Sequence, residues 1–122
     1  MRPFAMTARV AALACATALA AACGSSIPPP NDEWAAAEAD VGRAQAGGAP
    51  NVPEAKLHLQ FAVEDLQKSK QLIGDDNARA TSLTAVARAE AQLALSLAQA
   101  ASAQDRARSA QDELQKAQAT DH

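Results

Sequence analysis

Aromatic residues are almost absent from this chain of 122 residues: tryptophan and phenylalanine together make up 2% of it, and tyrosine is missing. A core built on large rings is therefore excluded. Residues with branched β-carbons are also few, and no stretch alternates apolar with polar residues, which argues against a sheet. Much of the 48% apolar content is alanine, which forms helices readily and buries little area. The composition predicts an all-α fold with a weak core.

The chain also lacks the sequence patterns of catalysis. It has five glycines, no glycine-rich phosphate loop and no serine in a nucleophile elbow. His58 and His122 have no metal-ligand spacing to each other or to a cysteine, and His58 is expected to be a partly exposed helix residue. We therefore expect no enzyme activity, no cofactor and no small-molecule substrate.

The charged residues are equally uninformative about chemistry. Adjacent acids on a helix do not share a face, and Asp75-Asp76 is explained by helix capping, so general acid and base work is not expected. The basic residues are expected to be solvated flanks, some pairing with acids three or four positions away. The acid pairs are Glu64-Asp65, Asp75-Asp76 and Asp112-Glu113, and the basic residues are Lys68, Lys70, Arg79 and Arg88.

What the chain does have is a distinctive N-terminal segment. Arg2 and Arg9 precede an uncharged run over 10–22, which has the length of the apolar region of a signal peptide and is short for a membrane span. The run ends in Leu19-Ala20-Ala21-Ala22-Cys23-Gly24, which is typical of a bacterial lipoprotein cleavage site. We expect removal of residues 1–22 by cleavage between Ala22 and Cys23, although Ala20 replaces the more common leucine.

A different signal peptidase offers an alternative. Ala20-Ala21-Ala22 also fits an A-x-A site, and cleavage there would release a soluble periplasmic protein. The lipoprotein interpretation is favoured because Cys23 would then be lipidated, whereas the alternative leaves it unexplained. Cys15 is lost with the signal, so Cys23 would be an unpaired thiol in an oxidising compartment.

Lipidation of Cys23 would supply the membrane anchor without a transmembrane helix, because two or more acyl chains bind a bilayer stably. Membrane lipid is thus the expected partner, and Gly24 in place of aspartate permits sorting to the outer membrane, facing the periplasm. Removal of Arg2 and Arg9 leaves nine basic against fourteen acidic residues, a net charge of about −5. That balance does not predict nucleic-acid binding.

The remaining chain divides into a tether over 23–31 and an alanine-rich helical domain over 32–122. The run of Pro28, Pro29 and Pro30 favours an extended tether. A first helix is predicted from an Asp32 N-cap to Ala46, ended by Gly47 and Gly48. Trp34, Ala37, Val41 and Ala44 lie on one face of this helix. Trp34 is expected to anchor that face in the core.

A second helix is predicted over 53–73 and a third from about 77 to 119, with Gly74 as the stop between them. The second helix carries an apolar stripe that Phe61, Val63 and Leu72 widen. In the third helix, leucines and Val86 recur every three or four residues, with alanines beside them. The stripe of the second is Leu59, Ala62, Leu66, Ser69 and Ile73; the third carries Leu83, Val86, Leu93 and Leu97 beside Ala87, Ala94 and Ala98. The expected fold is a small antiparallel three-helix domain with a long, protruding C-terminal helix.

The C-terminal part of the third helix has fewer large apolar residues. Ala100, Gln104, Ala107, Gln111 and Leu114 continue the spacing and make a poor coiled-coil seam. The tail from Gln104 is a solvated helix, a weak self-association surface or a segment ordered by an envelope protein partner.

The chain resembles a family of small bacterial lipoproteins described as domain of unknown function 4398, over about residues 23–103. The resemblance rests on Ala35-Ala36-Ala37-Glu38-Ala39, Gly47-Gly48-Ala49-Pro50, Pro53-Glu54-Ala55-Lys56-Leu57, Gly74-Asp75 and Ala89-Glu90-Ala91. It implies a lipoprotein signal, a proline-rich spacer and alanine-rich helices, and no known activity.

The second helix, the Gly74-Asp75 turn and the early third helix are also similar to one tetratricopeptide-type hairpin. Members of the domain of unknown function 4398 family often have an aromatic residue after this turn, where this chain has Asp76 and Asn77. A single hairpin is fewer than the three repeats that normally form a binding superhelix. The leading hypothesis is a non-enzymatic, Cys23-anchored helical spacer or adaptor; the alternative is a soluble periplasmic binding module.

Overall fold

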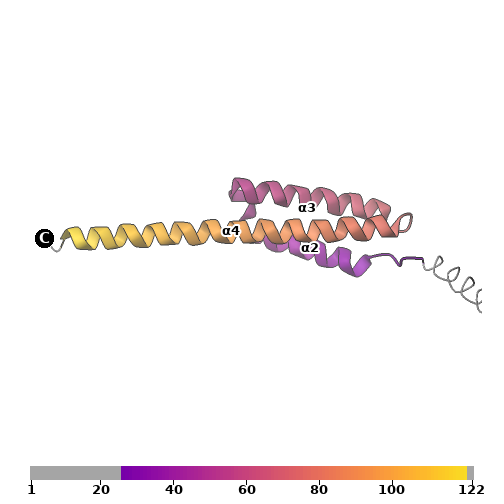
Figure 1. Cartoon of the computed structure of the whole chain (residues 1–122), viewed down its shortest axis with the longest axis horizontal. Coiled ribbons are helices and arrows are strands. Elements are labelled where there is room, and N and C mark those ends of the chain that lie inside the picture. The colour runs from indigo at the N-terminus through magenta and orange to yellow at the C-terminus, as the bar shows by residue number, and fades with distance from the viewer. Residues whose placement is uncertain (1–25, 121–122) are drawn as a thin grey trace, which may run out of the picture.

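The computed structural model describes residues 26–120, and across them the protein is helical, with short non-helical connections. Helix α2 (Asn31–Ala46) is followed by a single turn of 3-10 helix, η2 (Ala49–Asn51). Helices α3 (Pro53–Leu72) and α4 (Asn77–Thr120) then form an antiparallel hairpin, and α2 packs against both of them (Figure 1). The predicted all-α, three-helix fold is confirmed.

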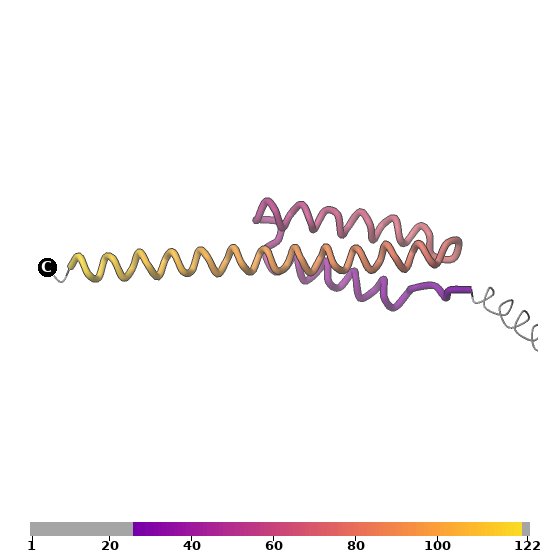
Figure 2. Tube along the Cα trace, in the orientation of Figure 1, coloured from indigo at the N-terminus to yellow at the C-terminus, as the bar shows by residue number. Residues whose placement is uncertain are grey.

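Helix α4 is much longer than the helices that cover it. Its 44 residues span about 66 Å, against about 30 Å for the 20 residues of α3. All residues from Ser102 to Thr120 are exposed, and this segment, called the arm below, leaves the domain as a single helix (Figure 2). The protruding C-terminal helix is therefore confirmed as well.

Most helix ends follow the predicted signals. Gly47 and Gly48 end α2, and Pro53 opens α3. Gly74 adopts a φ of 97°, a left-handed conformation that glycine takes without steric cost, and so stops α3. Asp76 caps α4, because its Oδ1 accepts a hydrogen bond of 3.0 Å from the backbone N–H of Arg79.

The predicted N-cap at Asp32 is wrong. Helix α2 begins one residue earlier, at Asn31, and its N-cap is Pro30, without a side-chain hydrogen bond. The carbonyl of Pro30 accepts from the N–H of Trp34 at 2.9 Å and closes the first turn. Pro30 is buried, so packing of the proline ring, rather than capping by a carboxylate, fixes where this helix starts.

Alanine dominates the core. Apart from Pro30, the buried apolar residues other than Val41, Leu59 and Leu66 are all alanines, and those that α4 contributes are alanine throughout. Because an alanine face lets helix axes approach closely, two larger residues of α4 lie beside the contact: Val86 is 46% exposed and Leu93 42% exposed. Leu95 and Leu97 are partly buried and pack against the core. Val86 and Leu93, two members of the predicted apolar stripe, thus lie outside the contact, whereas Ala87, Ala94 and Ala98, predicted beside that stripe, are buried. The buried alanines of α4 are Ala80, Ala87, Ala91, Ala94 and Ala98.

The predicted stripe of α3 is largely confirmed, since Leu59, Ala62, Leu66 and Ser69 are all buried. Ser69 donates to the carbonyl of Ala80 at 2.9 Å and lies 2.7 Å from the Thr84 hydroxyl, which satisfies both buried hydroxyls. Two predictions about the edges of the stripe are wrong. Phe61 is 43% exposed, and Ile73 lies just outside the helix as its C-cap.

Trp34 anchors the start of α2 on α3. Its ring is partly buried against the core, and its Nε1–H donates to the carbonyl of Leu66 at 3.1 Å. The ammonium of Lys70 lies 4.8 Å from the ring centroid, within the range of a cation–π contact. The role predicted for Trp34 is confirmed, while Lys70 is engaged at this ring and is not simply a solvated flank.

Candidate functional site

The lipidation site Cys23 and the cleavage position at Ala22 lie outside the described residues, but the structure shows where the chain after them joins the domain. Ile27 lies against the α3–α4 turn, where its carbonyl accepts a hydrogen bond of 2.8 Å from the Asn77 side-chain amide. The Oδ1 of the same Asn77 accepts from the N–H of Gly74 at 2.8 Å. One side chain thus joins the proline-rich segment to the turn.

This junction places the two ends of the described chain at opposite ends of the molecule. Ile27 is bound at the α3–α4 turn, and α4 runs from there to the free tip of the arm (Figure 1). In the sequence, Ile27 follows Cys23 by four residues. The described chain therefore enters the domain at the α3–α4 turn, at the end remote from the tip of the arm.

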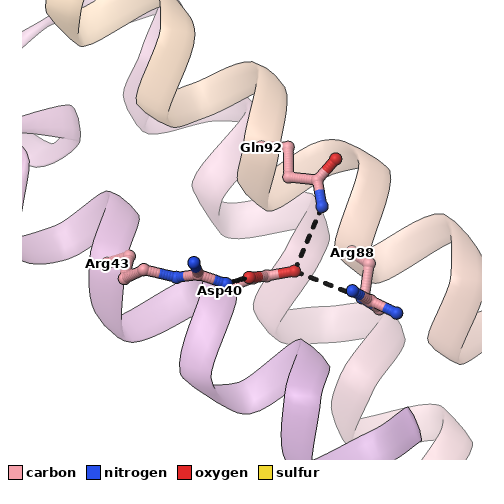
Figure 3. A network of polar contacts seen from close by, with 4 residues as sticks. All are labelled: Asp40, Arg43, Arg88 and Gln92. Atoms are coloured by element: carbon pink, nitrogen blue, oxygen red, sulfur yellow. Dashed lines mark hydrogen bonds and ion pairs between the residues drawn. The ribbon is translucent and has the colours of Figure 1, made fainter.

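A buried carboxylate holds α2 on α4. The side chain of Asp40 is 2% exposed, yet its Oδ2 accepts from Arg88 Nε and from Gln92 Nε2, each at 3.2 Å, while Oδ1 pairs with Arg43 (Figure 3). Both oxygens are thus hydrogen-bonded, as burial of a charge requires. The carboxylate has no remaining unpaired oxygen aimed at a ligand, so the network acts as a clamp between helices.

This network is not among the features predicted from the sequence. Arg88 is predicted to be a solvated flank, but it pairs with an acid on a different helix. The signal available is the position of Asp40, which lies next to Val41 in the apolar face of α2 and three residues before Arg43. A carboxylate in that face predicts a buried ion pair, although its partner on α4 follows only from the way the helices pack. Lys68, in contrast, pairs within its own helix with Glu64 and Asp65, as expected.

His58 also has a partner that the sequence did not indicate. Its side chain is 23% exposed, which confirms the expected partial exposure, and its Nδ1 lies 2.6 Å from Glu90 Oε2 on α4. The ring of Phe61 meets the imidazole edge to face at 6.3 Å. These contacts join α3 to α4, and they leave His58 as part of the helix packing.

The described residues offer little else to a ligand. Among residues 26–120, no three histidine, cysteine or acidic side chains are placed to hold a metal ion. An open cavity of about 640 Å³ lies where the arm leaves the domain, but the charged side chains that line it are all exposed. Over the same residues, no helix combines the length and apolar character needed to cross a bilayer.

Comparison with known proteins gave no match: no protein family, no curated protein and no solved structure is detectably similar to this chain. The resemblance to domain of unknown function 4398 therefore stays a prediction from the motifs alone.

Proposed function

We propose that this protein is a non-enzymatic lipoprotein of the bacterial cell envelope, anchored in the outer membrane through acylated Cys23. Its helical domain acts as a spacer or adaptor that faces the periplasm. The covalent lipid on Cys23 is its only cofactor-like group, and its direct partner is membrane lipid. Membership of the domain of unknown function 4398 family is part of the proposal.

The observation that carries this proposal is the position of the tether junction. Because Ile27 is bound at the α3–α4 turn and α4 leads away from it, an anchor at Cys23 would hold the turn close to the bilayer. The arm would then present its tip about 66 Å further along the helix axis. Because the tether joins the domain this far from the free tip of the arm, the domain is suited to act as a spacer or to reach a partner away from the membrane.

Loss of Cys23 is expected to abolish membrane attachment. In cells grown with labelled palmitate, the unaltered chain and a Cys15→Ala control should both carry label and sediment with membranes, whereas Cys23→Ala should carry none. Cys15 is the matched control because it lies in the segment expected to be removed. A two-acyl anchor holds a protein stably on a bilayer, so the difference should be nearly complete.

Equal absence of label in all three chains would contradict the anchor. A product with its N-terminus elsewhere than Cys23, recovered in the aqueous fraction, would favour the soluble periplasmic binding module in its place.

A further inference from the structure

Helix α4 leaves one apolar face uncovered along most of its length. The large apolar side chains of α4 that are exposed are Val86 (46%), Leu93 (42%) and Leu114 (64%). Val86 and Leu93 are seven residues apart, and Leu114 follows Leu93 after three further sevens. Ala100 and Ala107, both exposed, occupy the two intervening positions. A strict seven-residue repeat of exposed apolar residues is the pattern of a helix that pairs with another helix.

The second position of the repeat completes the face. It falls on Leu83, Glu90, Leu97, Gln104 and Gln111, each three residues before a member of the first set. Leu83 and Leu97 are partly buried, and Leu97 packs against the core on one side. On α3, Phe61 and Leu57 are 43% and 47% exposed, and they flank His58, which pairs with Glu90. We call the residues at these two repeat positions, from Leu83 to Leu114, the heptad face.

Apart from Glu90, the heptad face is uncharged, so two copies of it would bring no other like charges on the face together. The arm carries six charged residues within the described range, and none of them stands at either repeat position; only Arg108 directly flanks the face. The one charge on the face, Glu90, has His58 2.6 Å away as a partner in its own chain. The charged residues of the arm are Asp105, Arg106, Arg108, Asp112, Glu113 and Lys116.

The arm gains little stability from packing within the described chain. Its 19 residues from Ser102 to Thr120 are all exposed, whereas most helical stability in proteins comes from tertiary packing of one face. A second helix along Ala107, Gln111 and Leu114 would cover the side of the arm that carries no charge.

We propose that two copies of this chain associate in parallel through the heptad face, α4 against α4. In a parallel pair, Gln104 and Gln111 each lie opposite the same residue of the second copy. The two side-chain amides can then hydrogen-bond to each other, since each has both a donor and an acceptor. An antiparallel pair that joined Val86 to Leu93 would leave Leu114 beyond the start of the partner's α4 at Asn77. The parallel direction also rests on the proposed function, because it keeps both copies of Cys23 on one membrane.

The association is expected to be weak in solution. The heptad face contains few large side chains, whereas a standard stable interface uses about 20–30 residues from each partner, and small or polar residues at the seam lower stability. Anchoring two chains on one surface raises their effective concentration, so the membrane is where the dimer should form.

Cysteine cross-linking of the full chain in membranes tests the proposal. Ala107→Cys places a thiol on the heptad face, and Ser109→Cys, two residues on and equally exposed, places one on the opposite side of the helix. With oxidant, Ala107→Cys is expected to give a disulfide-linked dimer in at least fivefold greater yield than Ser109→Cys. Adding Leu93→Glu should lower that yield severalfold, whereas adding Gln99→Glu, at an exposed position away from the heptad face, should not.

Equal yields from Ala107→Cys and Ser109→Cys would overturn the dimer, as would insensitivity to Leu93→Glu. Palmitate labelling of the same samples separates this result from the anchor. Labelled chains that do not cross-link would contradict the dimer alone, and unlabelled chains that cross-link through residue 107 would contradict the anchor alone.

Discussion

Replacement of Trp34 by alanine is expected to lower the free energy of unfolding by about 3 kcal/mol, near the bottom of the range for removing a buried aromatic ring. The reason is that the rest of the core is mostly alanine, so the ring supplies a large share of the contact between α2 and α3. The change also removes the hydrogen bond from Nε1 to the Leu66 carbonyl and the contact with Lys70. In a domain of this size, the melting temperature should fall by roughly 12–24 °C, measured by circular dichroism.

Two comparison variants separate the contributions. Trp34→Phe keeps most of the packing and loses only the donor, so it should cost about 1 kcal/mol. Phe61→Ala removes an aromatic ring of which 43% is exposed, and it should likewise cost about 1 kcal/mol. If Trp34→Ala were no more damaging than Phe61→Ala, the anchoring role assigned to Trp34 would be wrong.

Removal of both arginines that face Asp40, in an Arg43→Ala and Arg88→Ala double variant, is expected to destabilise the domain by about 3 kcal/mol, because a buried charge left without its counter-ion is strongly unfavourable. The carboxylate of Asp40 is 2% exposed and would keep only Gln92 as a partner. Chemical denaturation followed by circular dichroism measures the loss.

The matched control removes the same number of arginines from the arm. Arg106→Ala with Arg108→Ala alters only exposed residues and should change stability by less than about 0.5 kcal/mol. Adding Asp40→Asn to the first double variant removes the unpaired charge and should restore at least half of the loss. A triple variant as unstable as the double one would mean that the arginines act through packing and not through charge.

The sequence was sufficient for the helices and their ends because the local signals are strong. Proline or glycine marks every helix boundary except the end of α4 at Thr120, and alanine favours helix between these boundaries. The one N-terminus predicted wrongly, at Asp32, is set by a tertiary contact, since buried Pro30 packs against the domain. Capping propensities describe local sequence only, so they do not predict which residue near the helix start will be buried in the folded domain.

The inward face of α4 was harder to predict for a physical reason. Leucine usually indicates the buried side of a helix, but here the close approach of the helices selects alanine, and Leu93 lies outside the contact. Val86 and Leu93 do recur at a seven-residue spacing, yet among the described residues both side chains stay about half exposed. Likewise the pairing of Asp40 with Arg88 joins positions 48 residues apart, which no local pattern reports.

The most direct test of the central claim is the distance of each end of α4 from the bilayer. Energy transfer to an acceptor lipid would be measured with the anchored protein in vesicles, using a donor on a cysteine at Asp75 in the turn or at Ala119 near the tip. We expect strong transfer from position 75 and little from position 119, because about 66 Å of helix separates the two ends. Equal transfer from both positions, or stronger transfer from position 119, would contradict a spacer held at the membrane by its turn.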